Sequence, residues 1–472
     1  MKYCLVPLGC QMNISDSERI RSVLERLGYE RTDHEEEANL LGIVACSVRQ
    51  KAIDKVYSKI HRWNEWKQEK HLITFASGCI LPADREKFLK RFDFVFSIQE
   101  LPQLPDIIRR YGVVSPAAVE ASYGESTGSM AGTGGARREH QLLGTEGRGD
   151  PLKDYRQIKP TYTSSFAAYV PIQNGCDKFC TFCAVPYTRG REMSRPSSEI
   201  LAEVQELVDR DYRSITLLGQ NVNSYGRDKR SGEITFAELL REVGELGRRS
   251  GKRFWVYFTS PHPRDMTDEV LEVIAEYDHL ARQIHLPIQS GDDEMLMRMN
   301  RNHGTDRYRE VIDSIRRILP GATLFTDIIV GFSGETDEQF ERTRAAMEEF
   351  RYNMAYIAMY SPRPGAAGAR WKDDVPHEEK KRRHAELSEV LKRISYEYNR
   401  SLLGREVTVL VEGRDRKPGH LTAKTEGRLI VRFPGDDETL IGSFARLRIT
   451  DCAELSLTGE LVRAEAAVGA AS

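Results

Sequence analysis

NGCDKFCTFC, residues 174–183, carries three of the chain's eight cysteines, Cys176, Cys180 and Cys183. Their spacing, C-x3-C-x2-C, is too dense for ordinary core residues. A structural zinc site takes four ligands, and no fourth Cys or His lies nearby in the sequence. A redox disulfide would use Cys180 and Cys183 and leave Cys176 unexplained. An iron–sulfur cluster held by three thiolates, with one iron open to another ligand, explains all three cysteines.

The segment around this stretch alternates predicted strands and helices, and each strand is followed by Gly and polar residues. Such an alternation predicts parallel strands in an open sheet or barrel, with functional groups at the strand carboxyl ends. We therefore expect a partial (βα)6 barrel over residues 161–403. Its six strands are Phe166–Ile172, Ser214–Leu218, Arg253–Phe258, Gln283–Pro287, Thr323–Val330 and Ala355–Tyr360.

Residues 1–112 show the same alternation on a smaller scale. Short apolar runs at Tyr3–Leu8, Leu40–Ala45 and Leu72–Ser77 predict three strands of an open parallel sheet with helices, an α/β domain. Ser15 or Asp16 is expected to cap the first helix, whose apolar side chains recur at helical spacing and which Gly28 ends.

Three cysteines of this domain occupy equivalent places, because Cys10, Cys46 and Cys79 each follow one of the three strands. Ligands of open α/β sheets gather outside the carboxyl ends of the strands, so residues far apart in sequence can converge there. The alternative is three buried apolar cysteines. The repeated position, and the Gly-Cys pairs at Cys10 and Cys79, favour a second metal site.

The rest of the chain divides by composition. Residues 113–160 are rich in Gly, Ser, Ala and Thr and predict a flexible linker or insertion. Residues 404–465 contain short strands between Gly, Pro and Asp turns and predict a small antiparallel β-barrel. Residues 466–472 are expected to be a disordered tail. The barrel strands are Val407–Val411, Gly419–Ala423, Leu429–Phe433 and Phe444–Ile449.

A basic amphipathic helix is predicted from His377 to Leu403, between the two barrels. Its run Lys380-Lys381-Arg382-Arg383 could contact phosphate, but such runs more often form a solvated helix face, and we expect that role here.

Global properties exclude several classes of protein. The net charge of −2, from 69 basic and 71 acidic residues, gives no overall basic signature, so a nucleic-acid partner must be met by local patches. No apolar run is long enough for a membrane span, and the N-terminus has no signal-peptide pattern. Eight cysteines are too few for a disulfide framework in a chain of this length. We expect a cytoplasmic protein, with no membrane partner.

These motifs together resemble the methylthiotransferase branch of the radical S-adenosylmethionine (SAM) superfamily. The resemblance rests on the cysteine stretch and its continuation AVPYTRGREMSRP, on LGCQMNISDSE, ACSVRQKA and SGC in the first domain, and on HLPIQSGDD, TDIIVGFSGETDEQF and YSPRPG in the second. PGHLTAKTEGRLIVRFPG in the last domain resembles the TRAM module. Within the branch, CQMN, CSVR and PYTRGRE are most similar to the tRNA enzymes that methylthiolate N6-isopentenyladenosine beside the anticodon.

The resemblance implies cofactors, roles and partners. Cys176, Cys180 and Cys183 would hold a 4Fe–4S cluster that binds SAM and cleaves it to a radical able to take hydrogen from C2 of adenine. Cys10, Cys46 and Cys79 would hold an auxiliary 4Fe–4S cluster that carries the sulfur. No side-chain acid or base is implied, because the cofactors carry the chemistry. The partners would be a tRNA anticodon stem-loop, an electron-donor protein and sulfur-delivery or cluster-assembly proteins, around a monomer.

Five further residues are candidate contacts of SAM or substrate. Arg189 and Arg191 follow the cysteine stretch and could hold a carboxylate or phosphate, or pair with nearby acids. Gln220, Asn221 and Asn223 follow a predicted strand and suit hydrogen bonds to cofactor or base. His285 is equally suited to a structural role.

Two other functions stay open from the sequence. The same machinery could methylthiolate a different tRNA adenosine, of the threonylcarbamoyl type, or an aspartate of a ribosomal protein. From another class, the chain could be a zinc-stabilised RNA-binding module without catalysis.

Overall fold

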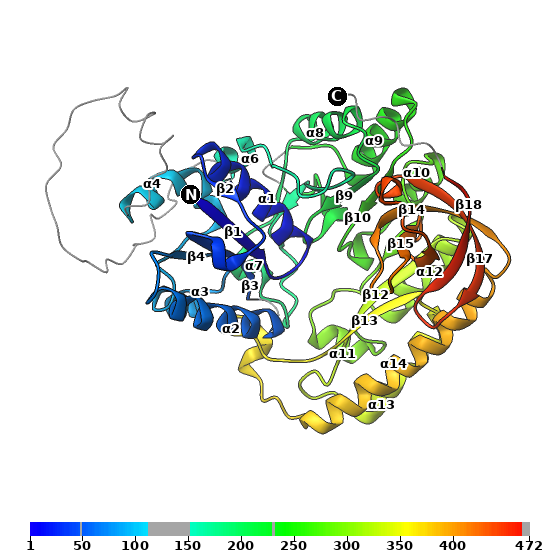
Figure 1. Ribbon diagram of the computed structural model, residues 1–472. Helices are drawn as coiled ribbons and strands as arrows, with labels where there is room; N and C mark the ends of the chain where they lie inside the picture. The colour runs from blue at the N-terminus through cyan, green and yellow to red at the C-terminus, as the bar shows by residue number, and fades with distance from the viewer. Residues whose placement is uncertain (48–49, 112–151, 229–231, 465–472) are drawn as a thin grey trace, which may run out of the picture. The chain divides into compact units, whose positions relative to one another are not determined.

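The computed structural model describes residues 1–47, 50–111, 152–228 and 232–464, which form two compact units, Met1–Thr163 and Ser164–Ser472 (Figure 1). Each unit is taken by itself below. Among the described helices, none combines the length and the apolar character that crossing a bilayer requires.

The first unit is built on a five-stranded parallel sheet of order β2-β1-β3-β4-β5. The open parallel α/β fold predicted for this part of the chain is confirmed. Its strands are β1 (Lys2–Pro7), β2 (Glu30–Arg31), β3 (Leu40–Cys46), β4 (Ile73–Cys79) and β5 (Phe94–Val95). Its helices are α1 (Gln11–Arg26), α2 (Gln50–Trp66), α3 (Pro82–Leu89), α4 (Leu104–Arg110) and α6 (Lys153–Gln157), with 3-10 turns η1 (Glu35–Glu37) and η2 (Ile98–Gln103).

The sheet is held by burial on both of its faces. All seven residues of β3, LLGIVAC, are buried, as expected for a central parallel strand covered by helices on both sides. Helix α2 contributes Ile53, Val56, Ile60 and Trp63 to the same core. The carboxyl ends of β1, β3 and β4, where the three cysteines stand, are therefore fixed by the best-packed part of the unit.

The predicted start of the first helix is wrong. Helix α1 begins at Gln11, with Cys10 as its N-cap and Asn13 at the third helical position. Ser15 and Asp16 lie inside the helix and are fully buried. Asp16 accepts a hydrogen bond from Tyr155 Oη at 2.8 Å, so its carboxylate binds a distant side chain rather than the end of its own helix.

Residues 152–163 pack on α1 and belong to the first unit. Thr161 N donates to Glu18 O at 3.0 Å, and Thr163 donates to Glu18 Oε1 from both its backbone N (2.9 Å) and its Oγ1 (2.7 Å). Most of the predicted linker, and the predicted tail, lie outside the described residues, and the described part of the linker contains α6. The domain boundaries given above stay a prediction.

The second unit contains the partial barrel, as two parallel three-stranded sheets of order β10-β9-β6 and β11-β12-β13. The β bridge between Val256 and Leu280 links β10 to the segment before β11. All six predicted strands are present, as β6 (Ala167–Pro171), β9 (Ser214–Leu218), β10 (Trp255–Phe258), β11 (Gln283–His285), β12 (Thr323–Val330) and β13 (Met354–Met359). The longer helices are α8 (Ser197–Asp209), α9 (Phe236–Ser250), α10 (Asp268–Glu276), α12 (Thr305–Ile318), α13 (Asp337–Phe350) and α14 (His377–Arg400).

The shorter elements of this unit lie in the connections at the barrel's strand ends. They are β7 (Gln173–Asn174), α7 (Val185–Thr188), β8 (Met193–Ser194), α11 (Asp293–Arg298) and the 3-10 turns η3 (Val222–Ser224), η4 (Pro263–Asp265) and η5 (Ala367–Arg370).

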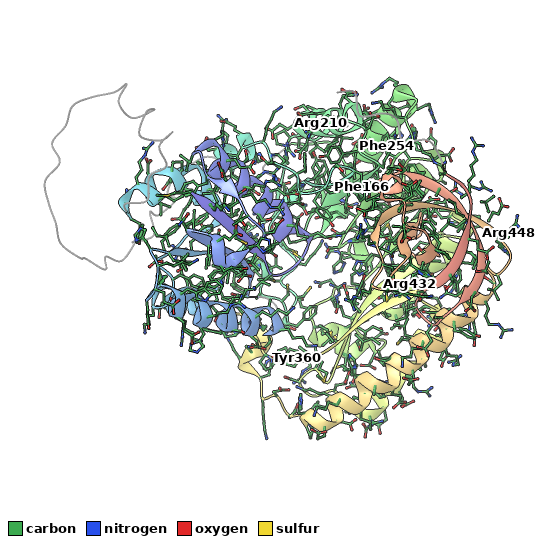
Figure 2. The ribbon with its side chains drawn as sticks, viewed as in Figure 1. Phe166, Arg210, Phe254, Tyr360, Arg432 and Arg448 are labelled. Carbon is green, nitrogen blue, oxygen red and sulfur yellow. The ribbon has the colours of Figure 1, made fainter. Side chains whose placement is uncertain are left out.

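The chain then closes into a five-stranded barrel of order β14-β15-β16-β18-β17. The predicted small β-barrel is confirmed, with two additions: β18 was not predicted as a separate strand, and its pairing with β16 is parallel. On the outer surface Arg432 pairs with Asp415 at 2.9 Å and Arg448 with Glu406 at 2.9 Å (Figure 2). The elements are β14 (Glu406–Arg414), β15 (His420–Thr425), β16 (Ile430–Pro434), η6 (Glu438–Leu440), β17 (Phe444–Cys452) and β18 (Leu457–Ala464).

The turn between β15 and β16 docks this barrel onto the strands of the other. Arg428 stacks its guanidinium 3.9 Å from the ring centroid of Tyr257 and donates to Thr216 Oγ1 at 2.9 Å. Gly427 O accepts from Thr323 Oγ1 at 2.8 Å. The contact is both apolar and polar, and it joins the two barrels of the second unit.

Candidate metal centres and their surroundings

The first cysteine triad lies in a loop whose two ends are tied together. β7 and β8 pair antiparallel through Gln173–Ser194 and Asn174–Met193, so residues 175–192 leave the barrel and return at one point. Cys176 N donates to Gly190 O at 3.2 Å just inside this clasp. Gly175 has φ +75°, and a Cβ there would lie 2.5 Å from Gly190 O, so the close approach requires glycine.

The three thiols of this loop are surrounded by N–H donors. Arg301, 6% exposed, donates Nη1–H to Cys180 Sγ at 3.5 Å, and Val185 N donates to Cys183 Sγ at 3.5 Å. Burial raises the pKa of Cys176 to about 12 and that of Cys183 to about 12, and the charge of Cys180 adds to both shifts. A cationic centre would favour the thiolate form of these cysteines.

Three cysteine thiolates are a donor set that an iron–sulfur cluster takes. Over the residues that the structure describes, no three His, Cys, Asp or Glu side chains are grouped as ligands of one ion. A zinc site would need four such ligands around one point. A four-iron cluster binds each thiolate through a different iron, and hydrogen bonds to the sulfurs tune it. Arg301 and Val185 supply such bonds.

Buried polar atoms without a hydrogen-bond partner collect at the neighbouring strand ends. They are Gln173 Oε1 after β6, Gln220 Oε1 and Asn221 Oδ1 after β9, and His262 Nε2 after β10. Such atoms are rare in folded proteins and call for an explanation. His262 Nδ1 accepts from Arg264 N at 3.2 Å, so Nε2 carries the proton of the neutral ring. Three acceptors and one donor suit a ligand with ammonium, hydroxyl and amino groups, and SAM has all of these.

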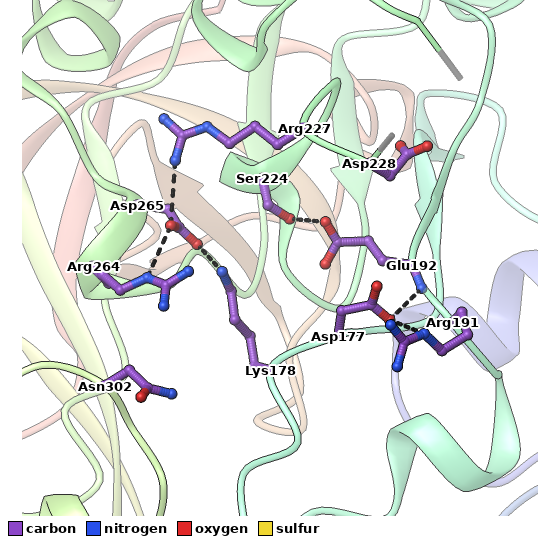
Figure 3. A pocket seen from close by; sticks show the side chains of 10 residues that line it. All are labelled: Asp177, Lys178, Arg191, Glu192, Ser224, Arg227, Asp228, Arg264, Asp265 and Asn302. Atoms are coloured by element: carbon purple, nitrogen blue, oxygen red, sulfur yellow. Dashed lines mark hydrogen bonds and ion pairs between the residues drawn. The ribbon is translucent and has the colours of Figure 1, made fainter. Parts of the chain in front are cut away.

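A cavity of about 560 Å³ opens beside the cysteine loop and is lined by charged side chains (Figure 3). Asp265, almost fully buried, binds Lys178 at 2.6 Å, Arg227 at 3.3 Å and Arg264 at 3.4 Å. The pKa of Asp265 is lowered: its burial acts in the opposite direction, and the hydrogen bond and charge of Lys178 overcome it. The two arginines each keep about half of their side chain exposed, so they present unused donors to the cavity.

The opposite wall of this cavity comes from the loop and η3. Arg191 Nε pairs with Asp177 at 3.0 Å and lies 5.2 Å from the Phe179 ring centroid, while 56% of its side chain stays exposed. Glu192 accepts from Ser224 Oγ at 2.5 Å, and burial raises the pKa of Glu192. Tyr187, exposed, stands edge-on to Phe179 at 6.4 Å. The wall offers a cation and a hydrogen-bonding carboxyl, and the aromatic pair of Phe179 and Tyr187 lies next to Arg191.

The other candidate residues occupy different positions. Arg189 is buried and donates to Asn174 Oδ1 at 3.4 Å, beside the clasp. Asn223 uses both ends of its amide on the backbone of His262, accepting from its N at 2.8 Å and donating to its O at 2.9 Å. His285 Nε2 lies 3.2 Å from Asp327 Oδ2, and its ring stands edge-on to Tyr356. Of the two candidate arginines, Arg191 lines the cavity.

The basic run of α14 is not a solvated face throughout, so that prediction is wrong for half of it. Lys380 and Arg383 are buried. Lys380 Nζ donates to Tyr360 O at 3.1 Å and pairs with Asp373. Arg383 binds Glu335 at 2.7 Å, and Glu335 in turn accepts from Gly331 N at 2.6 Å. Lys380 therefore stabilises the loop after β13, and Arg383 stabilises the loop after β12.

The second triad lies in the first unit, at the ends of three strands. Cys46 and Cys79 are register partners on β3 and β4, and Cys10 caps α1 directly after β1. A Cβ at Gly9 would lie 2.7 Å from the Cβ of Cys46, which shows how closely the first strand end approaches the second. The predicted convergence of these cysteines at one sheet edge agrees with this geometry.

Several residues of these sites were not predicted. Asn13, in the Cys10-x2-Asn13 spacing, bonds to the surroundings of all three cysteines of the first unit. Arg301 and His303 follow Asn300 and precede Gly304 in a tight turn, where Asn300 and Asn302 have φ of 56° and 55°. The run MNRNHG carries a turn signal, but nothing in it indicates a contact with Cys180.

Comparison with known proteins matches three parts of the chain to known families. Residues 170–347 match the radical SAM superfamily, residues 2–98 the uncharacterized protein family UPF0004, and residues 400–462 the TRAM domain. A tRNA-2-methylthio-N(6)-dimethylallyladenosine synthase of Actinobacillus pleuropneumoniae is 38% identical over 475 residues, 99% of this chain and 94% of that protein. Proteins of the same name from Dictyoglomus thermophilum and Carboxydothermus hydrogenoformans are each 37% identical over 98% of this chain and 99% of their own length.

Among solved structures, the radical SAM methyltransferase TsrM of Kitasatospora setae is similar with a TM-score of 0.49 and 15% identity, covering 75% of this chain and 72% of that one. A likeness at this level supports no argument about the sites.

Proposed function

The chain belongs to the radical SAM methylthiotransferases, in the family of tRNA-2-methylthio-N(6)-dimethylallyladenosine synthases, and we propose that it adds a methylthio group to C2 of N6-isopentenyladenosine next to the anticodon of tRNA. Its cofactors are SAM and 4Fe–4S clusters. One observation carries the proposal most directly: each unit gathers three cysteines of its own at strand ends or in a clasped loop.

Two triads correspond to two chemical needs. Cys176, Cys180 and Cys183 would hold the cluster that supplies reductive SAM cleavage and hydrogen abstraction, and Cys10, Cys46 and Cys79 the cluster that supplies sulfur. A radical module alone needs only the first triad. The second triad therefore favours sulfur insertion over the other outcomes of radical chemistry.

The side chains around the first triad would bind and orient SAM. Gln220 Oε1 and Asn221 Oδ1, which have no hydrogen-bond partner in the described structure, would accept from its amino and hydroxyl groups, and His262 Nε2–H would donate. Asn223 holds the His262 backbone in place from both sides. Arg189 holds the base of the loop through Asn174. Burial of these groups keeps water away from the reacting atoms.

The charged cavity would receive the RNA. Arg191, Arg227 and Arg264 keep exposed donors beside the loop, and arginine binds phosphate through paired N–H groups. Phe179 and Tyr187 offer aromatic surface on which an unstacked loop base can rest. The substrate would be the single-stranded anticodon loop, with the target adenosine splayed out of its stack.

The test is the nucleoside content of tRNA. Cells that lack this protein should lose the 2-methylthio-N6-isopentenyladenosine peak in mass spectrometry and accumulate N6-isopentenyladenosine, and the wild-type gene should restore the peak. An unchanged peak would overturn the proposal. Loss of the 2-methylthio-threonylcarbamoyl nucleoside, or of methylthio-aspartate in a ribosomal protein, would identify the alternative substrates instead.

The cellular setting follows from this substrate. Modification of tRNA would take place in the cytoplasm, with an electron donor for SAM cleavage and a sulfur-delivery or cluster-assembly protein to restore the second cluster. We propose a monomer, because one chain carries both triads. The zinc-stabilised RNA-binding module has no support in the arrangement of the thiols.

A further inference from the structure

Asn13 is a fully buried polar side chain at the centre of the second cysteine triad. Its exposed fraction is 0%, and it stands at the third helical position of α1, one turn after Cys10. A buried amide is retained only where its hydrogen bonds are met. The bonds of Asn13 reach the surroundings of all three cysteines.

The amide contacts each of the three strand ends in turn. Its Oδ1 accepts from Cys10 N at 3.2 Å and from Cys10 Sγ at 3.4 Å. Its Nδ2 donates to Ala45 O, the carbonyl before Cys46, at 2.8 Å, and reaches Cys79 Sγ at 4.0 Å. One side chain thus links the positions of Cys10, Cys46 and Cys79.

The two Gly-Cys pairs of the sequence make room for this amide. A Cβ at Gly9 would collide with Asn13 Oδ1, and one at Gly78 would lie 2.9 Å from Asn13 Nδ2 and 2.5 Å from Ala45 O. Gly78 also has φ +100°, which other residues rarely adopt. The glycines beside Cys10 and Cys79 and the amide of Asn13 therefore form one packing arrangement.

We propose that Asn13 positions the three cysteines of the first unit and donates an N–H to the Cys79 sulfur of the cluster that they bind. The inference rests on the proposed function, because it assumes that this triad holds the auxiliary cluster. Its Oδ1 is held by Cys10 N and its Nδ2 by Ala45 O, so the amide cannot turn, and its second N–H is aimed at Cys79. Hydrogen bonds to cluster sulfurs raise the reduction potential, and partners of metal ligands are worth about ten- to a hundredfold in metal affinity.

A purely structural role would be that of a helix cap. In that role an aspartate serves as well, because it accepts from Cys10 N and its charge suits the N-terminus of a helix. An aspartate cannot take the positioning role, because its second oxygen would face Ala45 O and the Cys79 thiolate where asparagine presents N–H groups. Asn13→Asp therefore separates the two roles while keeping the size of the side chain.

The experiment uses the full chain with Cys176→Ala, Cys180→Ala and Cys183→Ala, so that only the auxiliary cluster can form. After anaerobic reconstitution, Asn13→Asp and Asn13→Ala should lose iron to a chelator at least about tenfold faster than the parent. The cluster that remains should have a lower midpoint in a redox titration followed by electron paramagnetic resonance. The matched control is Ile20→Val on the same helix, also fully buried, which should leave both measurements unchanged.

Equal iron retention and an equal midpoint in Asn13→Asp and the parent would overturn the inference. Thermal unfolding is also measured for Asn13→Asp and Asn13→Ala in a chain with Cys10→Ala, Cys46→Ala and Cys79→Ala. This measurement tests whether the substitutions at Asn13 prevent folding by themselves. Failure to fold there, where the auxiliary cluster cannot form, would show a role in folding alone and also overturn the inference. A parent that binds no iron would instead contradict the proposed function, so the two failures are distinguishable.

Discussion

The two cysteine triads offer the same three ligands, but their cysteines come from different kinds of segment. In the first unit Cys10, Cys46 and Cys79 come from three separate strand ends, and a neutral amide, Asn13, lies among them. In the second unit all three come from one short loop, and a cation, Arg301, touches a sulfur. The triad of Cys10, Cys46 and Cys79 depends on the sheet as a whole, whereas the loop triad depends on the clasp and on one turn. Substitutions should therefore disturb the two triads independently and by different amounts.

Removing either triad should have the largest effect and should separate two activities. Replacing Cys176, Cys180 and Cys183 by Ala should abolish SAM cleavage and the product together, because no site for the SAM-binding cluster remains. Replacing Cys10, Cys46 and Cys79 should abolish the methylthio product and leave SAM cleavage. Chromatography of 5′-deoxyadenosine and mass spectrometry of the RNA measure the two. Loss of SAM cleavage in both variants would contradict the division of roles.

A matched pair of glycines tests how each triad depends on its surroundings. At Gly78 a Cβ would meet Ala45 O at 2.5 Å with φ +100°, whereas at Gly190, φ +79°, it would meet nothing within 4 Å. Gly78→Ala should destabilise the first unit by about 3 kcal/mol or more, from strain plus collision, and Gly190→Ala the second by about 1 kcal/mol. Urea unfolding with iron analysis checks both. Equal costs would contradict the geometry at Gly78.

Replacing Arg301, the cation beside Cys180, should weaken only the cluster of the loop triad. Arg301→Gln removes the charge and the N–H that reaches Cys180 Sγ, so iron retention by this triad should fall about tenfold and SAM cleavage should slow. Arg298→Gln, an exposed arginine in α11, is the control. Iron retention is measured in a chain whose Cys10, Cys46 and Cys79 are replaced by Ala, so that only the loop triad can bind iron. Unchanged retention would show that Arg301 stabilises only the turn, through its hydrogen bond to Pro287 O.

The last expected effect is a pH dependence of the stability of the second unit, which leaves both triads in place. Burial lowers the pKa of His303 to about 4, and the charge of Arg301 adds to the shift. Because the unfolded chain takes up this proton near pH 6.5 and the folded one does not, stability is lost as the pH falls from 6.5 toward 4. From pH 7.5 to 5 this histidine should cost about 2 kcal/mol. His303→Gln should lose less stability on acidification than wild type in urea unfolding, whereas His377→Gln, at the exposed start of α14, should behave as wild type.

Local sequence predicted the features that depend on local physics. Apolar runs predict strands such as the one observed at Leu40–Cys46, whose seven residues are all buried. The spacing of Cys176, Cys180 and Cys183 predicts the loop triad. Glycine and polar residues after each strand mark the ends where the sites lie. The family resemblance and the partial barrel followed from these signals.

The errors arose where a distant partner decides the role of a side chain. Asp16 looks like a helix cap, but it lies inside α1 and binds Tyr155, far along the chain. Lys380 and Arg383 look like a solvated run, but Asp373, Tyr360 and Glu335 bury them. Asn13 and Arg301 resemble ordinary turn or cap residues until the fold brings a sulfur beside them. Such contacts need the tertiary structure.

The clasp of β7 and β8 has a consequence for cluster release. Two residue pairs hold the base of the loop, and further bonds hold its middle, from Thr181 N to Met299 O and from Asn300 Nδ2 to Phe179 O. Each such bond is worth about 1 kcal/mol net. In the closed loop Cys180 is buried and Cys183 is half-buried. These bonds should keep the loop closed in the folded protein, so the release of a bound cluster should be slow.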